Sequence, residues 1–288
     1  MAGVLYSIAT PLGNLGDIGG RVAATFEMVS TIYAEDTRHS RVLLDHLGIQ
    51  RPLRSLHQHN EQKRREEVLA LLARGENIAL ISDAGTPGVS DPGSWVIGEA
   101  LREGYRVSPI PGPSALAAAL SVCGFSQGQS DIWFIGFLPL KKKLRNAMVA
   151  RIEAHPGLVV FFEGPHRGAS TLAELAERMP EREISVCREL TKIHEEVLRF
   201  TLEEAASWGQ QGIKGELTMV LGPGRPIDET PTGEGVDEAL RRCLGQGMSN
   251  RDAASAVATV LGLRRKEVYR RCLDLHPAKE KSAQPTDE

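Results

Sequence analysis

The residues best suited to bind a ligand lie in loops rich in glycine and proline that follow segments expected to be buried strands. The central loop, Asp83–Gly93, contains three glycines, two prolines and two aspartates, and it follows the apolar segment Ile78–Ser82. Two similar loops, Thr10–Asp17 and Pro111–Ala115, also follow strand-like segments. Such loops expose backbone N–H and C=O groups and let a ligand approach the main chain closely. One such loop could be an ordinary surface turn, but three together favour a binding site.

Four titratable side chains near the ends of other expected strands could act as a general base. They are Asp36, Glu163, His166 and Lys192. Each could equally be a helix cap or one half of a structural ion pair, so the pattern does not choose among them.

Several cations have positions that suit RNA phosphates. Lys141, Lys142 and Lys143 lie together before an expected helix, and Arg38 and Arg167 each follow an expected strand. The alternatives are a solvated helix start for the lysines and an ion pair with Asp36 or Glu35 for Arg38. His57 and His59 have a spacing that could bind a metal, but no third ligand of matching type is nearby, and we expect no metal.

The elements that must position these residues alternate between strands and helices in the first half of the chain. Strands are expected at Gly3–Ala9, Ser30–Ala34, Ile78–Ser82 and Arg106–Ile110, and Asp17 is expected to cap the helix after the first of them. This alternation predicts a parallel sheet covered by helices, whose loops converge at one edge. The sequence contains no Gly-x-Gly-x-x-Gly and no P-loop, which argues against a Rossmann dinucleotide site and against a nucleotide phosphate site.

Strand-like segments are closer together in the second half. Because there is too little chain between them for parallel crossovers, we expect a mixed sheet there. The segments are Asp131–Phe137, Gly157–Phe162, Glu183–Arg188, Glu196–Phe200 and Leu217–Leu221. The expected domains are therefore an N-terminal α/β domain at 1–115, a second α/β domain at 116–226, a small helical domain at 227–277 and a disordered tail at 278–288.

The helical domain differs from the rest of the chain in its charge. Eight basic and four acidic residues lie between Glu238 and His276, although the whole chain has a net charge of −3. Its expected helices, Ala253–Leu261 and Val268–Leu273, are joined by a Gly turn, and Arg264, Arg265 and Lys266 precede the second. This pattern is typical of a helix-turn-helix that contacts a polyanion, and the alternative is a plain helical cap or dimer contact.

Composition predicts a cytoplasmic globular protein. Hydrophobic residues make up 41% of the 288 positions, and no apolar run approaches the ~20 residues that a membrane span requires. The N-terminus has no basic region or cleavage site typical of a signal peptide. The four cysteines are widely spaced and form no Cys-x-x-Cys pair, which fits a reducing compartment.

Six short motifs, in this order, resemble the tetrapyrrole methylases, the class III S-adenosylmethionine-dependent methyltransferases. Within that family they are most similar to the bacterial 16S ribosomal RNA (cytidine 2′-O) methyltransferases. The motifs are Ala9–Leu15, Glu35–Arg38, Ser82–Gly88, Pro111–Ala115, Phe162–Arg167 and Cys187–Lys192. The first and central loops differ from the Gly-Ala-Gly-Pro-Gly-Asp and Gly-Asp-Pro types of the tetrapyrrole-modifying members, which argues against a porphyrinoid substrate.

The resemblance implies two α/β domains with S-adenosylmethionine in the cleft between them. It assigns the donor to the converging loops, and the residues concerned are Pro11, Leu12, Asp83, Ala84, Gly85, Val89, Ser90, Ser114 and Ala115. It also implies 2′-O-methylation of a cytidine ribose in the decoding centre of 16S rRNA, with the rRNA or the small subunit as partner, and a homodimer. The open alternatives are a small-molecule methyltransferase and a non-catalytic nucleic-acid-binding ligand sensor.

Overall fold

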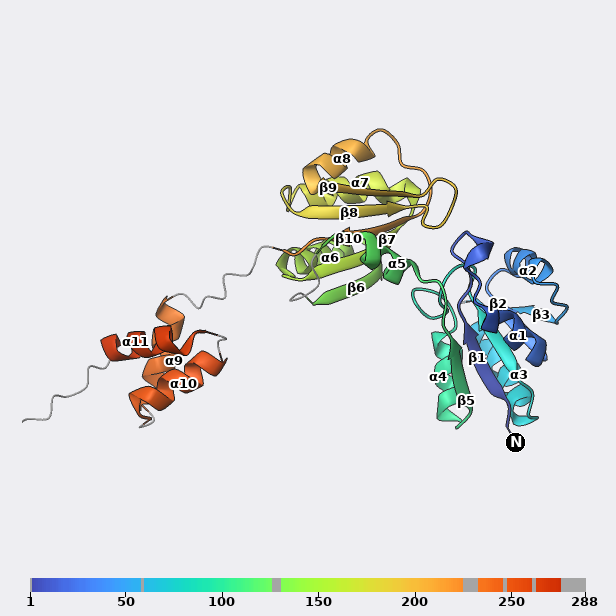
Figure 1. Ribbon diagram of the computed structural model, residues 1–288, viewed down its shortest axis with the longest axis horizontal. Coiled ribbons are helices and arrows are strands. Elements are labelled where there is room, and N and C mark those ends of the chain that lie inside the picture. Colours follow the sequence, from blue (N-terminus) through green and yellow to red (C-terminus); the bar gives the residue numbers. More distant parts are fainter. Residues whose placement is uncertain are drawn as a thin grey trace, which may run out of the picture. The chain divides into compact units, whose positions relative to one another are not determined.

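The computed structural model describes residues 2–57, 60–125, 131–224, 233–245, 248–260 and 263–275 (Figure 1). The chain divides into two compact units, Met1–Arg225 and Pro226–Glu288. The predicted linker after Gly224, the Gly262 turn and the tail at 278–288 all involve residues outside the described ranges, so the predicted domain boundaries remain predictions.

The first unit begins with a five-stranded parallel sheet in the order β3-β2-β4-β1-β5. Because all five strands run in the same direction, their carboxyl ends and the loops that follow lie along one edge. The strands are β1 (Val4–Ile8), β2 (Thr31–Ala34), β3 (Leu53–Ser55), β4 (Ile78–Ile81) and β5 (Arg106–Ile110). The helices are η1 (Leu15–Asp17), α1 (Gly20–Met28), α2 (Thr37–His46), α3 (Glu61–Ala73) and α4 (Ser94–Arg102).

Both faces of this sheet are covered, as its continuous apolar strands require. Neighbouring residues of one strand point to opposite faces, so Ile32 packs in a core with α1 and α2, whereas Tyr33 packs with α3 and α4. Phe26 from α1 and Leu72 from α3 are fully buried in these two cores. The predicted parallel, helix-covered sheet is confirmed.

The second sheet of this unit is mixed, as predicted, with the order β6-β7-β10-β8-β9. Only β6 and β7 are parallel, and the other neighbours are antiparallel. The strands are β6 (Ile132–Phe137), β7 (Leu158–Glu163), β8 (Glu183–Arg188), β9 (Glu196–Thr201) and β10 (Leu217–Leu221). The helices are α5 (Ala115–Val122), α6 (Lys142–Ala154), α7 (Pro165–Ala176) and α8 (Leu202–Gly209), and α6, α7 and α8 share a core with one face of the sheet.

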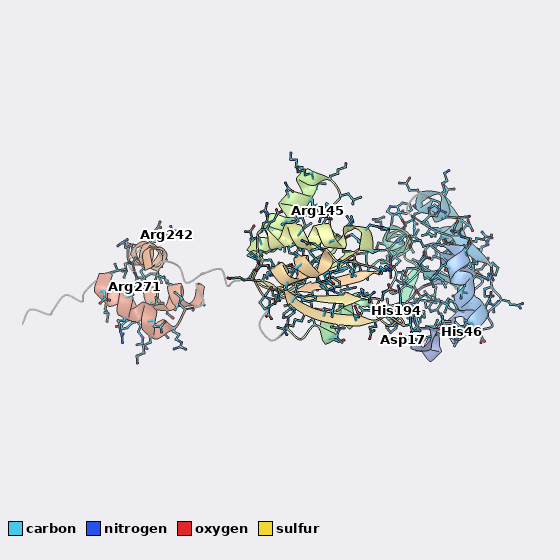
Figure 2. The ribbon with its side chains drawn as sticks, turned by 90° about the horizontal axis from the view of Figure 1, so that it is seen from above. Asp17, His46, Arg145, His194, Arg242 and Arg271 are labelled. Atoms are coloured by element: carbon cyan, nitrogen blue, oxygen red, sulfur yellow. The ribbon has the colours of Figure 1, made fainter. Side chains whose placement is uncertain are left out.

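The second unit contains α9 (Gly233–Gly245), α10 (Asn250–Val260) and α11 (Arg265–Leu275). Its core is formed by small and aliphatic side chains, with Leu240, Ala254 and Cys272 fully buried. Ser249 caps α10, because its hydroxyl accepts a hydrogen bond from the Asp252 backbone N–H at 3.2 Å. Figure 2 shows Arg242 and Arg271 on this unit. Among the described residues, no helix has the length and apolarity that a membrane crossing requires.

One local prediction was wrong. Asp17 does not cap α1: it lies inside η1, which is capped by Asn14, and α1 begins after Gly19 without a side-chain cap. A 3-10 turn between β1 and α1 therefore takes the residue that the sequence suggested as a cap. Of the two histidines whose spacing could bind a metal, His57 follows β3, which ends at Ser55, and His59 lies outside the described residues.

Candidate functional site

The site is a cavity of about 430 Å³ in the first unit, lined by residues from both sheets. The N-terminal sheet supplies the loops after β1, β4 and β5. The mixed sheet supplies the ends of β6 and β7, the loop after β8 and the start of β10. This volume is typical of a small-molecule or cofactor site.

Hydrogen bonds hold together the three loops that the sequence predicted to converge. The backbones of Thr10 and Gly85 exchange two hydrogen bonds, at 2.8 and 3.0 Å. The Thr86 hydroxyl donates to the Pro113 carbonyl oxygen at 3.2 Å. The loops after β1, β4 and β5 therefore form one bonded surface at the carboxyl edge of the parallel sheet.

Gly85 shows how closely the backbone is packed at this edge. Its φ is +81°, a conformation that favours glycine. A Cβ atom there would lie 3.2 Å from the Leu12 side chain, which also lines the cavity. A side chain at this position would therefore be strained and would crowd the wall of the cavity.

Most of the residues assigned to the cofactor line this cavity. They are Leu12, Asp83, Ala84, Gly85, Val89, Ser114 and Ala115. Pro11 and Ser90 are not among the lining residues. Ser90 has a φ of +68° and faces the mixed sheet, because a Cβ atom at Gly136 in the bulge of β6 would lie 2.5 Å from its hydroxyl oxygen. Its packing against Gly136 gives it a structural role between the sheets.

Glu163 lines the cavity, but its carboxylate is fully engaged. Its oxygens accept hydrogen bonds from the Thr171 hydroxyl at 2.7 Å and from the Gly164 backbone N–H at 2.9 Å. Arg167 forms an ion pair with it at 2.5 Å and also donates to the Leu138 carbonyl oxygen. Because Glu163 is almost completely buried, this network is what keeps a charged group stable there.

Lys192 lies in the connection between β8 and β9. Its Nζ contacts Glu189 and Glu216, each at 2.9 Å. Burial lowers the pKa of Lys192, but the hydrogen bonds that its amino group donates to Glu216 and Glu189 outweigh burial and raise it. The lysine is therefore held charged. The turn is strained, since Glu189 and Thr191 are non-glycine residues with φ of +53° and +66°.

Asp36 and His166 are not among the lining residues. Asp36 caps α2 by accepting a hydrogen bond from the Arg38 backbone at 2.8 Å, and it pairs with the Arg38 side chain at 2.7 Å. These bonds lower the pKa of the Asp36 carboxyl. Its own backbone N–H donates to Asp83 at 2.9 Å, which connects the loops after β2 and β4. His166 is exposed in the first turn of α7.

Asp91 is a lining residue that the candidates from the sequence did not include. Burial, followed by the negative charges of Glu35 and Asp83, raises its pKa to about 6, although a hydrogen bond from the Ser82 hydroxyl acts in the opposite direction. Glu35 has a raised pKa for related reasons, burial first and the charge of Asp83 second. The only sequence signal for Asp91 was its position in the central loop.

The mixed sheet supplies further lining residues that the sequence analysis missed. Phe137 ends β6 and Phe162 is the penultimate residue of β7, and their rings meet edge to face with centroids 5.6 Å apart. Cys187 and Thr218 also line the cavity, from β8 and β10. Their positions at the ends of neighbouring strands would have identified them only if the strand order had been known.

The predicted RNA-binding cations differ in how free they are. Lys141, Lys142 and Lys143 are exposed at the start of α6, and no salt bridge involves them within the described ranges. Arg38 pairs with Asp36 but remains 89% exposed. Arg167 is committed to Glu163 and Leu138. In the helical unit, Arg264, Arg265 and Lys266 are exposed at the start of α11.

The described residues contain no group of three or more His, Cys, Asp or Glu side chains that could hold a metal ion. The four cysteines are free, and three of them are buried.

Two family models match the chain. Residues 4–206 match the family described as Tetrapyrrole (Corrin/Porphyrin) Methylases, and residues 229–276 match the RsmI C-terminal HTH domain. The second match covers α9, α10 and α11.

Curated relatives match almost the whole chain, and those compared here are named Ribosomal RNA small subunit methyltransferase I. The relative from Synechocystis sp. is 38% identical and aligns with 95% of this chain and 98% of its own length. The relative from Xylella fastidiosa is 40% identical and aligns with 93% of this chain and 98% of its own length. The relative from Mesorhizobium japonicum is 41% identical and aligns with 94% of this chain and 92% of its own length.

Solved structures share the fold at low sequence identity. The methyltransferase CobJ has a TM-score of 0.59 at 18% identity, covering 77% of this chain and 95% of its own. Diphthine synthase has a TM-score of 0.58 at 14% identity, and the match covers 76% of this chain and 89% of its own. Uroporphyrin-III C-methyltransferase from Thermus thermophilus, solved with S-adenosyl homocysteine, has a TM-score of 0.54 at 17% identity, covering 76% and 97%.

Proposed function

The chain belongs to the tetrapyrrole methylase family, and we propose that it transfers a methyl group from S-adenosylmethionine to the small-subunit ribosomal RNA. The acceptor that we propose is the 2′-hydroxyl of a cytidine ribose in the decoding centre. The observation that carries this proposal is the cavity between the two sheets, at the edge where ligands bind in open α/β sheets. The curated relatives, named for methylation of the small-subunit RNA, support the choice of acceptor.

The residues of the cavity fit the methyl donor chemically. S-adenosylmethionine supplies, when bound, a methyl group attached to a positively charged sulfur. Leu12, Val89 and Phe162 provide apolar walls for a flat adenine, and Asp83 provides negative charge for a cation. Gly85 leaves room for close approach to the backbone, since a Cβ atom there would crowd this wall. We assign the donor to this surface, which includes Ala84, Ser114 and Ala115 as well.

The protein residues contribute mainly by positioning the two reactants. The loops after β1, β4 and β5 are hydrogen-bonded to one another, so the surface that would hold the donor is formed before binding. Such preorganisation lowers the entropic cost of aligning donor and acceptor. A base that accepts the hydroxyl proton would add to this, and Asp36, Glu163, His166 and Lys192 remain the candidates from the sequence.

Exposed cations would hold the RNA. We assign phosphate contacts to Lys141, Lys142 and Lys143, and to Arg264, Arg265 and Lys266 in the helical unit. Arg38 is sufficiently exposed to contribute as well, even though it pairs with Asp36. Arg167 is better placed to hold Glu163 than to contact a phosphate. We further propose that the enzyme acts in the cytoplasm and that it is a homodimer. Light scattering would test the homodimer by measuring the molar mass in solution.

A methyl-transfer assay tests the proposed function. The protein is incubated with tritiated S-adenosylmethionine and with small subunits, or 16S RNA, from a strain that lacks this gene, and ribose methylation is then mapped. We expect about one methyl group per RNA, at a single cytidine ribose. Binding of the donor without transfer would favour the ligand sensor. Transfer to a porphyrinoid and not to RNA would favour the small-molecule methyltransferase.

A further inference from the structure

Four carboxylates line the described part of the cavity, and two of them, Glu163 and Glu216, are paired with a cation. Glu163 is held by Thr171, Gly164 and Arg167. Glu216 pairs with Lys192 at 2.9 Å. Asp83 accepts the backbone N–H of Asp36 at 2.9 Å. The fourth, Asp91, accepts a hydrogen bond from the Ser82 hydroxyl.

In the part of the chain that the structure describes, Asp91 has no cation partner, unlike Glu163 and Glu216, and Asp83 is assigned to the donor. No salt bridge involves it within the described ranges. It is partly buried in the central loop, immediately after Ser90, and the charges that raise its pKa are those of two other acids, Glu35 and Asp83. Across the cavity, Glu163 and Glu216 have their charge balanced by Arg167 and Lys192. A carboxylate in this position faces the cavity without a fixed cation to neutralise it.

We propose that Asp91 is the general base of the methyl transfer, an inference that rests on the proposed function. The proton of the acceptor hydroxyl passes to the Asp91 carboxylate while the hydroxyl oxygen forms its new bond to the methyl carbon. The electron pair of the broken carbon–sulfur bond stays on the leaving sulfur, and the products are the methylated ribose, the neutral thioether and protonated Asp91. The proton is released to solvent when the products leave.

The surroundings of Asp91 suit this role. A catalytic base works best when its pKa lies close to the operating pH, because it is then deprotonated and still has a driving force to accept a proton. Burial and the charges of Glu35 and Asp83 together raise the pKa of Asp91 to about 6, against the lowering effect of the Ser82 hydrogen bond. The candidates from the sequence are less suitable. Glu163 is paired with Arg167 and Lys192 is held as a cation, whereas Asp36 and His166 do not line the cavity.

The test compares Asp91→Asn with Asp45→Asn, an exposed aspartate on α2 that does not line the cavity. We expect Asp91→Asn to lower the single-turnover transfer rate by about 100-fold or more. Calorimetry should show donor and RNA dissociation constants within about threefold of the wild type. Asp91→Glu, which keeps a carboxylate, should recover part of the rate, and Asp45→Asn should match the wild type.

A second variant, Glu35→Gln, tests the pH dependence of the transfer rate, which would not change if Asp91 had only a structural role. Glu35→Gln removes the strongest charge that raises the pKa of Asp91. The acid limb of the pH profile of kcat/KM should therefore move to lower pH, and a carbon-13 NMR titration of the Asp91 carboxyl should move in the same direction. In Asp91→Asn, this limb should disappear.

The outcomes separate this inference from the proposed function. If the wild type transfers no methyl group to RNA, the proposed function fails. If the wild type is active but Asp91→Asn keeps its rate, or loses donor affinity in proportion to its rate, Asp91 is not the base. An acid limb that stays in place in Glu35→Gln would also overturn the inference.

Discussion

A Cβ atom at Gly13 would lie 2.3 Å from the Cγ atom of Lys192, so the loop after β1 touches the loop between β8 and β9 at a glycine. Asp17 and His194, labelled in Figure 2, belong to the same two connections. Lys192 is not free to move aside without cost, because Glu189 and Glu216 hold its amino group. The contact therefore sets the spacing of the two sheets next to Leu12, which lines the cavity.

Gly13→Ala should impair transfer more than it impairs folding. The added methyl group must displace the Lys192 stem and shift the adjoining loops, and small misalignments are costly for a reaction that depends on positioning. We expect kcat/KM to fall by about tenfold, while the free energy of unfolding changes by less than about 1 kcal/mol. Gly20→Ala is the control, since a Cβ atom there meets nothing within 4 Å. Equal activity in both variants would show that the contact does not matter.

Thr171→Val should destabilise the fold. The variant keeps the shape of the side chain but removes the hydroxyl that donates to Glu163 at 2.7 Å, inside a buried network. Leaving a buried carboxylate without one of its donors should lower the free energy of unfolding by about 1–3 kcal/mol, measured by urea titration. Ser207→Ala removes an exposed helical hydroxyl and should change it by less than about 0.5 kcal/mol. A cost for Thr171→Val no larger than for Ser207→Ala would contradict this account of Glu163.

The stability of the protein should report the raised pKa of Asp91. Its pKa is about 6 in the folded state and close to 3.8 when it is unfolded, so the folded state binds the proton more tightly. The stabilising effect is fully present at low pH and is lost as the pH rises through 6. Asp91→Asn should therefore be more stable than the wild type at pH 8, by on the order of 1 kcal/mol after allowing for solvent screening, and no more stable below pH ~4.

Urea titrations of both proteins across this pH range provide the measurement. Asp45→Asn is the matched control, because Asp45 is an exposed aspartate that does not line the cavity. A stability difference for Asp91→Asn that is the same at both pH values would mean that Asp91 does not titrate in this window.

Replacing Lys141, Lys142 and Lys143 together by alanine should weaken RNA binding and reduce its dependence on salt. Each lost phosphate contact should lower the slope of log K against log salt by roughly 0.7 to 0.9, so the slope should fall by about 2 if all three contact the RNA. Filter binding over a salt series gives both quantities. The control is Lys63→Ala with Arg106→Ala, two exposed cations that do not line the cavity, and an equal loss there would indicate a non-specific charge effect.

The start of α11 should provide a second RNA contact. Replacing Arg264, Arg265 and Lys266 by alanine should raise KM for RNA by about tenfold or more with little change in donor affinity, because these exposed side chains lie away from the core of Leu240 and Cys272. Circular dichroism should show intact helices. Arg242→Ala is the control, since this exposed arginine of α9 lies 3.6 Å from Glu238. An unchanged KM in the triple variant would remove the helical unit from RNA binding.

Much of the fold followed from local patterns in the chain. The segment Ile78–Ile81 is apolar on both faces because helices cover both sides of a parallel sheet, and Gly85 and Pro87 mark the loop after it. The short intervals between the later strands correctly predicted a mixed sheet. The wrong prediction that Asp17 caps α1 has a local cause as well. Asn14 caps a 3-10 turn, η1, and Asp17 is the last residue of that turn.

The sequence by itself therefore determined the element types, the loops that converge on the cavity and the family, because periodicity, turn residues and short motifs act over neighbouring positions. Only the tertiary structure decided which side chains are free to react. It paired Glu163 with Thr171 and Arg167, committed Lys192 to two acids, and left Asp91 facing the cavity beside Glu35. Those relationships depend on strand order and on contacts between distant loops, and the charge and burial that they create have no signature in any local stretch of the chain.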